Sequence, residues 1–299
     1  MARRSDTRGR SRGRWVVVLA LVLTVLVAVV VVRATIRATD PGYSKTYGAT
    51  VVRYSLASDV LDRSLDEVAI VPPGNAPRPL LVLLHGRHDP SPLSWLIPSK
   101  SGPETMLSDE LFYALGRLGT RAPVVVLLNG GGHSYYHDRR DGQWASMLLN
   151  EAIPDAVRRF AGKRSPVAIG GISMGGYGAL HLAALRPGQF CAVGGHSAAL
   201  WQNAGSSAPG AFDDTADFVR NDVFGAVEEN RLSGMRVWID GGDDDPYREA
   251  DAALVAFLRR HGARVTYHLW PGGHTNAYWR EHVRAYLRFY ADALARCQR

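Results

Sequence analysis

Residues 168–185 read AIGGISMGGYGALHLAAL, a short apolar run that leads into a glycine-rich turn and then into good helix formers. Within it, Gly171, Ser173 and Gly175 form the pattern G-x-S-x-G. Between a strand and a helix, this pattern is typical of a nucleophile elbow, a sharp turn that exposes a serine at the carboxyl end of a sheet. Glycines suit such a turn because the strand and the helix approach closely. The stretch therefore predicts Ser173 as a nucleophile, and its spacing fits neither a dinucleotide fingerprint nor a P-loop.

Strand-like and helix-like segments alternate from about residue 46 onward. The later strand candidates are continuous runs of Val, Ile and Leu, which is typical of strands buried on both faces of a parallel sheet. The alternation predicts an α/β fold, with a mostly parallel sheet of about eight strands flanked by helices and an antiparallel edge made by the first two strands. The expected strands are residues 50–56, 67–72, 79–85, 123–129, 166–171, 190–195, 235–240 and 264–270. The expected helices are residues 104–118, 147–161, 174–186, 247–262 and 276–297.

A nucleophilic serine needs an acid and a base, which follow it in that order along a chain of this architecture. The strand 235–240 runs into an aspartate-rich loop, and we place the acid there at Asp245, with Asp243 as the alternative. The other two aspartates, Asp240 and Asp244, are interpreted as turn or helix-capping residues. His274 lies in a glycine loop after the last strand, where it can reach the serine as general base.

An oxyanion hole requires two backbone N–H groups aimed at one developing negative charge. The residue after the nucleophile, Met174, is expected to supply one of them. The loop after the third strand is expected to supply the other, from Arg87, because Gly86 permits a close approach. An ordinary His85-Gly86 turn accounts for the same loop residues equally well.

The N-terminal part of the chain differs in composition from the rest. Residues 1–14 hold six arginines and one aspartate, and residues 15–32 form an apolar run that is just long enough to span a bilayer. We predict a cytoplasmic tail over 1–14, a transmembrane signal anchor over 15–32, a linker over 33–45 and an extracytoplasmic domain over 46–299. The alternative is a cleaved signal peptide and a secreted protein.

The charge beyond this tail is balanced. From Asp40 onward the sequence holds 27 basic and 27 acidic residues, so the high pI belongs to the tail and no nucleic-acid partner is expected. Cys191 lies in an apolar run, and we expect it to be a free buried cysteine, although a disulfide with Cys297 is permitted outside the cytoplasm. His133 and His137 lack a third ligand, so no metal site is expected.

These motifs, in this order, resemble the esterase D-like branch of the α/β-hydrolases over roughly residues 48–290. The resemblance rests on LLVLLHGRHD, VVVLLNGGGHSYYHD, GISMGGYGAL, the aspartate-rich loop and PGGHTNAYW. It implies the α/β-hydrolase fold and a serine hydrolase that cleaves a carboxylic ester or thioester through an acyl-enzyme intermediate. No cofactor and no obligate protein partner are implied.

The same branch includes S-formylglutathione hydrolases and the mycolyltransferases of mycobacteria, so acyl transfer to a sugar or lipid alcohol is one alternative. A non-catalytic protein of the cell envelope with the same fold is another. The segments 88–104 and 201–214 fall where such folds line an acyl pocket. We therefore expect a small-molecule or lipid acyl ester as substrate. Trp95, Trp144 or Trp201 is expected to border the pocket, with Trp144 included because it resembles a tryptophan that follows the matching segment in the mycolyltransferases.

Overall fold

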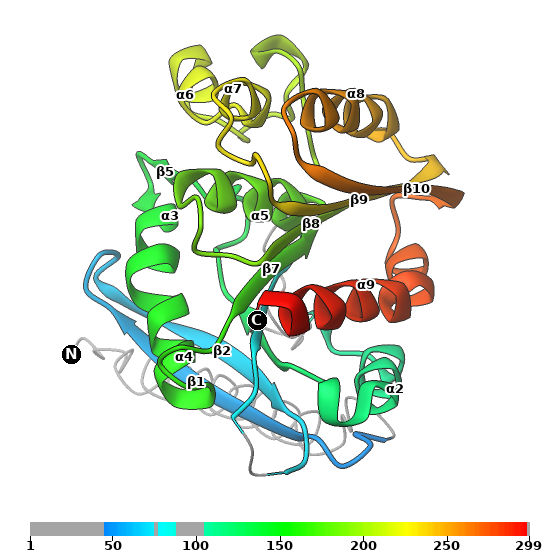
Figure 1. The fold of residues 1–299 in the computed structure, drawn as a ribbon. Helices are drawn as coiled ribbons and strands as arrows, with labels where there is room; N and C mark the ends of the chain where they lie inside the picture. The colour runs from blue at the N-terminus through cyan, green and yellow to red at the C-terminus, as the bar shows by residue number, and fades with distance from the viewer. Residues whose placement is uncertain (1–44, 75–76, 88–104, 298–299) are drawn as a thin grey trace, which may run out of the picture. The chain divides into compact units, whose positions relative to one another are not determined.

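The computed structural model describes residues 45–74, 77–87 and 105–297. Its centre is an eight-stranded sheet with the order β1-β2-β4-β3-β7-β8-β9-β10 (Figure 1). The strand pairs β1–β2 and β2–β4 are antiparallel, and every later pair in this order is parallel. The strands are β1 (Thr50–Ser58), β2 (Arg63–Val71), β3 (Leu80–Leu84), β4 (Val124–Leu128), β7 (Val167–Ile172), β8 (Ala192–His196), β9 (Arg236–Asp244) and β10 (Arg264–Gly273).

Helices cover both faces of this sheet (Figure 1). The helices α2 (Asp109–Leu118) and α9 (Asn276–Cys297) pack together on one face, where α9 contacts β7, β8 and β9. The other face carries a larger set, of which α4 contacts β3, α5 contacts β7 and β8, and α8 contacts β9 and β10. This set is α3 (Trp144–Met147), the π-helical turn η3 (Leu148–Ala152), α4 (Ile153–Phe160), α5 (Met174–Leu185), α7 (Val223–Glu228) and α8 (Arg248–Arg260).

The alternation of side chains along β3 explains why the central strands read as unbroken apolar runs. Leu80, Val82 and Leu84 point into the core beneath α4 and α5, whereas Leu81 and Leu83 point into the core beneath α2 and α9. All five side chains are buried. A strand with a core on each face has no position for a polar residue, so the periodicity of a half-exposed strand is lost.

The predicted α/β architecture, the eight strands, the antiparallel edge and the five helices are therefore confirmed. The short helices α6 (Thr215–Arg220) and α7 were not predicted from the sequence, and neither was the small hairpin of β5 (Asp138–Arg139) and β6 (Gly142–Gln143). Helices and strands of this length carry too few residues to show a periodicity.

The prediction of a free Cys191 is wrong. Cys191 precedes β8 and forms a disulfide with Cys297 at the end of α9. The Cα atoms are 5.9 Å apart, and the two residues are separated by 106 positions in sequence. The two cysteines meet because of the tertiary structure, in which α9 crosses the sheet and brings Cys297 back to the beginning of β8. The bridge closes a long loop and so constrains the unfolded chain.

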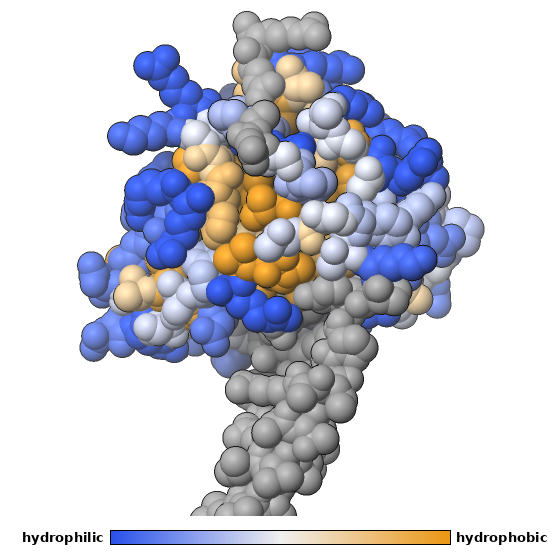
Figure 2. All heavy atoms as spheres, turned by 90° about the horizontal axis from the view of Figure 1, so that it is seen from below, coloured by the Kyte–Doolittle hydropathy of each residue, from blue (hydrophilic) through white to orange (hydrophobic). Residues whose placement is uncertain are grey.

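Hydrophilic side chains form most of the described surface in the view from below, around a central apolar area (Figure 2). Among the residues that the structure describes, no helix has both the length and the apolar character that a membrane crossing requires. The predicted tail 1–14, the anchor 15–32, the linker up to residue 44 and the pocket segment 88–104 lie outside the described residues.

Candidate active site

Ser173 lies in a strained turn between β7 and α5. Its backbone has φ 53° and ψ −118°, an uncommon conformation for a residue with a side chain. The glycines around it are needed for close approach. A methyl group on Gly171 would collide with the backbone of Gly175, and one on Gly175 would collide with the backbone of Leu84. The geometry is that of the predicted elbow, since the strand, the turn and the helix follow directly on one another.

The side chains of Ser173, His274 and Asp245 form a continuous hydrogen-bonded row. The Oγ of Ser173 lies 2.8 Å from Nε2 of His274, and Nδ1 of His274 lies 2.9 Å from Oδ2 of Asp245. His274 directly follows β10, and Asp245 directly follows β9, so neighbouring parallel strands deliver both side chains to the same edge of the sheet. This row can take a proton from the serine and hold the resulting imidazolium next to a carboxylate.

The Asp245 side chain is buried, with 2% of the residue exposed. Burial alone would raise the pKa of this carboxyl group, but hydrogen bonds from the His274 ring and from the Tyr247 N–H outweigh burial and lower the pKa. The Tyr247 N–H donates to Oδ1 at 2.9 Å, so each carboxylate oxygen has its own donor. The carboxyl group is therefore held ionised where an imidazolium would need it.

The other three aspartates of the loop are directed elsewhere. Asp243 is exposed, and its Oδ1 accepts a hydrogen bond from the Gly272 N–H at 3.0 Å. Asp244 is also exposed. The interpretation of Asp240 as a turn or capping residue is wrong, because this residue lies inside β9 and is fully buried. The structure thus brings Asp245 to the histidine and leaves Asp243 exposed near the end of β9.

Two loops meet beside Ser173, at the place predicted for an oxyanion hole. Met174 is the first residue of α5 and is fully buried, so its N–H belongs to the unpaired first turn of that helix. Gly86 lies against the serine, since a methyl group on Gly86 would be 3.6 Å from the Ser173 Cβ. Arg87 follows, and its guanidinium group lies 3.4 Å from the Pro209 carbonyl oxygen.

Two of the three predicted pocket tryptophans can be placed. The half-buried ring of Trp201 lies 5.7 Å from the Tyr247 ring, which in turn lies 5.1 Å from the His274 ring. Trp144 is 6% exposed, packs against Gly131 and Gly142 and donates to Asp141, so it belongs to the core. Trp95 lies outside the described residues. Of the two predicted tryptophans that the structure describes, Trp201 is the one that approaches the row of three, and Trp279, which was not predicted, lies 5.0 Å from the His274 ring.

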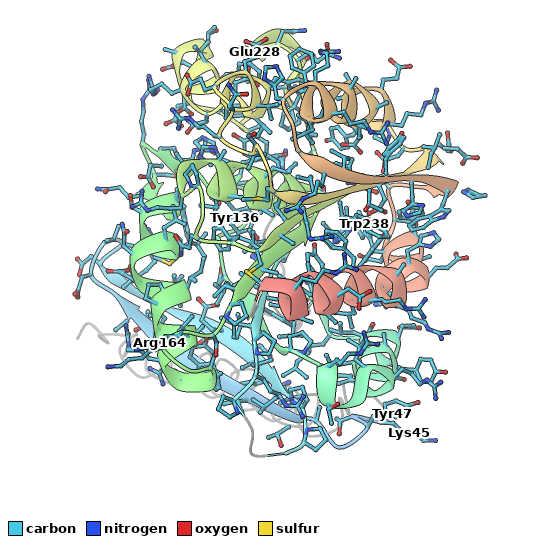
Figure 3. All side chains as sticks on the ribbon, in the orientation of Figure 1. Lys45, Tyr47, Tyr136, Arg164, Glu228 and Trp238 are labelled. Atoms are coloured by element: carbon cyan, nitrogen blue, oxygen red, sulfur yellow. A yellow bond between two sulfur atoms is a disulfide. The ribbon has the colours of Figure 1, made fainter. Side chains whose placement is uncertain are left out.

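A buried polar network around Asp240 was not predicted from the sequence. Four side chains donate hydrogen bonds to its two carboxylate oxygens. They are Trp238 (2.6 Å), His196 (2.7 Å), Tyr286 (2.8 Å) and Tyr278 (3.0 Å). Trp238 is seen in Figure 3 between the sheet and α9, where this network joins the two.

This network touches both ends of the candidate site. The backbone carbonyl of His196 accepts the Ser173 N–H at 3.0 Å, and the His196 ring packs on Tyr286 with centroids 3.7 Å apart. Tyr278 stands in the first turn of α9, directly after the loop that carries His274. A signal existed in the sequence, since Tyr278, Tyr286 and Tyr290 recur at helical spacing on one face of α9.

His133 and His137 do not converge. His137 is fully buried and its Nε2 lies 3.0 Å from Asp217, whereas His133 is exposed. Burial lowers the pKa of His137, and the neighbouring Asp217 only partly opposes this effect. In the described part of the chain, no group of three or more His, Cys, Asp or Glu side chains is arranged to hold a metal ion.

Comparison with known proteins identifies the family. A family model described as "Putative esterase" matches residues 63–290, which is more than half of the chain. The chain belongs to the Esterase family. An acetyl esterase from Caldicellulosiruptor saccharolyticus is 26% identical over 189 residues, which span 56% of this chain and 71% of that protein. Both names support an ester-hydrolysing enzyme.

Solved structures show the same fold in other esterases. A ferulic acid esterase is similar with a TM-score of 0.67 and 23% identity, over 82% of this chain and 98% of its own. An S-formylglutathione hydrolase from Agrobacterium tumefaciens is similar with a TM-score of 0.64 and 18% identity, over 84% of this chain and 98% of its own. The mostly parallel eight-stranded sheet is therefore that of the α/β-hydrolase fold, as the resemblance implied.

Proposed function

We propose that this esterase is a serine hydrolase that cleaves a carboxylic ester or thioester through an acyl-enzyme intermediate. The observation that carries the proposal is the hydrogen-bonded row from Ser173 through His274 to Asp245. The turn between β7 and α5 presents the half-buried serine, and the buried carboxylate fixes the ring that receives its proton.

In the first half of the reaction, the Ser173 Oγ attacks the substrate carbonyl while its proton passes to Nε2 of His274. The ester or thioester bond then breaks, and the same proton goes to the leaving alcohol or thiol. In the second half, water gives a proton to His274, attacks the acyl-enzyme and releases the acid, after which the serine regains its proton. Asp245 stays ionised throughout and stabilises the imidazolium.

The negative oxygen that forms in both halves needs donors near Ser173. We assign the backbone N–H groups of Met174 and Arg87 to this role, because each belongs to one of the two loops that meet beside the serine. Trp201, next to Tyr247, is assigned to the wall of the acyl pocket. The names of the relatives, an acetyl esterase and a ferulic acid esterase, suggest short or aromatic acyl groups as the first substrates to try.

The proposal is tested by labelling with a fluorophosphonate probe, with Ser173→Ala as the control. We expect labelling that disappears in the variant, and no labelling of well-folded protein would overturn the proposal. A panel of p-nitrophenyl esters of graded chain length, with and without a sugar acceptor, then measures product release. Transfer to the acceptor in place of hydrolysis would move the assignment from esterase to acyltransferase.

We also propose that the enzyme works outside the cytoplasm and is held by the apolar run 15–32. The Cys191–Cys297 disulfide supports an oxidising compartment. The test is protease treatment of intact cells followed by fractionation. We expect the catalytic domain to be digested from outside and the uncut protein to sediment with membranes, and a protected, soluble protein would refute the location.

A further inference from the structure

A groove of about 350 Å³ lies between the beginnings of β9 and β10 and the last turns of α9. It is remote from the reacting serine in the fold, because it lies at the amino ends of the strands and the nucleophile lies at their carboxyl ends. Trp238 and Phe289 form an aromatic floor with ring centroids 5.3 Å apart. Four arginines contribute to the walls, namely Arg236, Arg264, Arg288 and Arg296.

The arginines are placed where like charges oppose one another. Arg236 and Arg264 begin neighbouring parallel strands and are direct partners in the register. Like charges at such positions destabilise a sheet. Partial burial, together with the nearness of Arg296 and Arg264, lowers the pKa of the Arg236 guanidinium. A folded protein tolerates a local cost of this kind most readily where function requires it.

The carboxylate that could neutralise this cluster is already engaged. Asp292 stands one helical turn from both Arg288 and Arg296 on α9, yet its Oδ1 accepts a hydrogen bond from Arg121 at 2.7 Å. Within the described ranges, none of the four groove arginines forms an ion pair with a carboxylate. Asp292 also lines the groove, and the Arg264 guanidinium donates to the Gly234 carbonyl oxygen at 2.8 Å. With four guanidinium groups and one carboxylate, the groove carries a net positive charge.

The disulfide holds this arrangement together. Cys297 follows Arg296, and Cys191 precedes Ala192, which is the register partner of Arg236 on β8. The covalent bond thus fixes the end of α9 beside the first residues of β8 and β9, against the repulsion between Arg236 and Arg296. The walls of the groove stand on a helix and two strands, so the site is preorganised.

We propose that this groove is a binding site for a phosphate-bearing ligand, separate from the catalytic site. Guanidinium groups match the geometry of phosphate oxygens with paired N–H donors, and several of them together favour a group with more than one negative charge. The aromatic floor accommodates an apolar or flat portion next to the phosphate. The phosphate can be carried by a soluble molecule or by the headgroup of an anionic lipid.

The test uses the full-length protein, with inorganic pyrophosphate as the soluble probe in isothermal titration calorimetry. The groove variant is Arg288→Gln with Arg296→Gln, and the matched control is Arg117→Gln with Arg284→Gln, which removes the same charge from exposed helix positions outside the groove. We expect the groove variant to bind pyrophosphate at least about tenfold more weakly than the parent, which corresponds to about 1.4 kcal/mol. The control should bind like the parent.

A second arm distinguishes the two sources of phosphate. Flotation with phosphatidylglycerol vesicles is compared with flotation with phosphatidylcholine vesicles for the parent and both variants. If the groove variant alone loses the excess binding to phosphatidylglycerol, the ligand is a lipid headgroup, and if only pyrophosphate binding falls, it is a soluble phosphate. No binding of pyrophosphate and no lipid preference in the parent, or equal losses in both variants, would overturn the proposal. Ester hydrolysis should be unchanged in the groove variant.

Discussion

Replacing Asp245 by asparagine keeps the size of the side chain and removes its charge, so the effect on His274 can be followed atom by atom. The Tyr247 N–H donates to Oδ1 of Asp245, and in the variant this donor favours the amide oxygen at the same place. The amide NH2 group must then face Nδ1 of His274, which becomes an acceptor. The ring carries its proton on Nε2 instead and points it at Ser173.

A histidine in that tautomer cannot take the serine proton, and the carboxylate that stabilised the imidazolium is gone. We expect the turnover number to fall about 10⁴-fold, which corresponds to about 5.4 kcal/mol in the activation free energy. KM should change little, because neither the Asp245 carboxylate nor Nδ1 of His274 is placed against the acyl group. The assay is steady-state hydrolysis of p-nitrophenyl acetate by purified protein, with circular dichroism to confirm the fold.

Asp243→Asn is the matched control for this prediction. Its side chain is exposed and accepts one hydrogen bond from the Gly272 N–H, which an amide oxygen can accept as well. Turnover should therefore stay within about threefold of the parent. The reasoning is refuted if Asp243→Asn loses as much activity as Asp245→Asn, or if Asp245→Asn keeps more than about a tenth of the parental turnover.

Three further predictions concern stability and positioning. Cys191→Ser with Cys297→Ser should lower the free energy of unfolding by about 4 kcal/mol, because the bridge closes a loop of about 100 residues; urea denaturation of the variant and of the reduced parent should agree. His181 is buried, and burial first, followed by the charges of neighbouring groups, lowers its pKa to about 3. Between the ordinary pKa of histidine and this lowered pKa, the unfolded state binds a proton that the folded state does not bind. The free energy of unfolding therefore falls with falling pH, by about 1.4 kcal/mol per pH unit. His181→Leu should flatten this slope in denaturation curves measured from pH 4.5 to 7. Tyr278→Phe removes one of four donors to Asp240 next to the His274 loop, and we expect a loss of about 1–2 kcal/mol in stability with turnover reduced more than KM is raised; unchanged stability would show that the hydrogen bond contributes nothing.

The parts of the molecule that could be predicted are those whose pattern lies within a short stretch of consecutive residues. The strands appear as apolar runs because both of their faces are buried, and the elbow appears because the strand, the turn and the helix around Ser173 are contiguous. His274 could be found since it follows the last strand in a glycine loop. For the acid, the sequence offered four aspartates, and only the positions of the Tyr247 N–H and the His274 ring distinguish Asp245 from Asp243.

The parts that could not be predicted depend on residues far apart in the chain. The network on Asp240 joins β8, β9 and α9, and a sequence does not say which buried tyrosines will face a particular carboxylate. The prediction of a free Cys191 was wrong for the same reason, since Cys191 and Cys297 are brought together only by the path of α9 over the sheet. Trp144 was expected at the pocket wall from the resemblance to the mycolyltransferases, but its ring packs against Gly131 and Gly142 and lies in the core.

Helix α9 begins two residues after His274 and ends at Cys297, so the last 22-residue helix of the chain joins the proposed base to the disulfide. At 1.5 Å per residue its axis is about 33 Å long. The ends of a helix fray unless they are tied down. Preparations from a reducing host should therefore lose activity on warming before the sheet melts, while spectroscopic signals of folding still look normal. For this enzyme, the oxidation state of Cys191 and Cys297 should be measured for every preparation, together with the protein concentration.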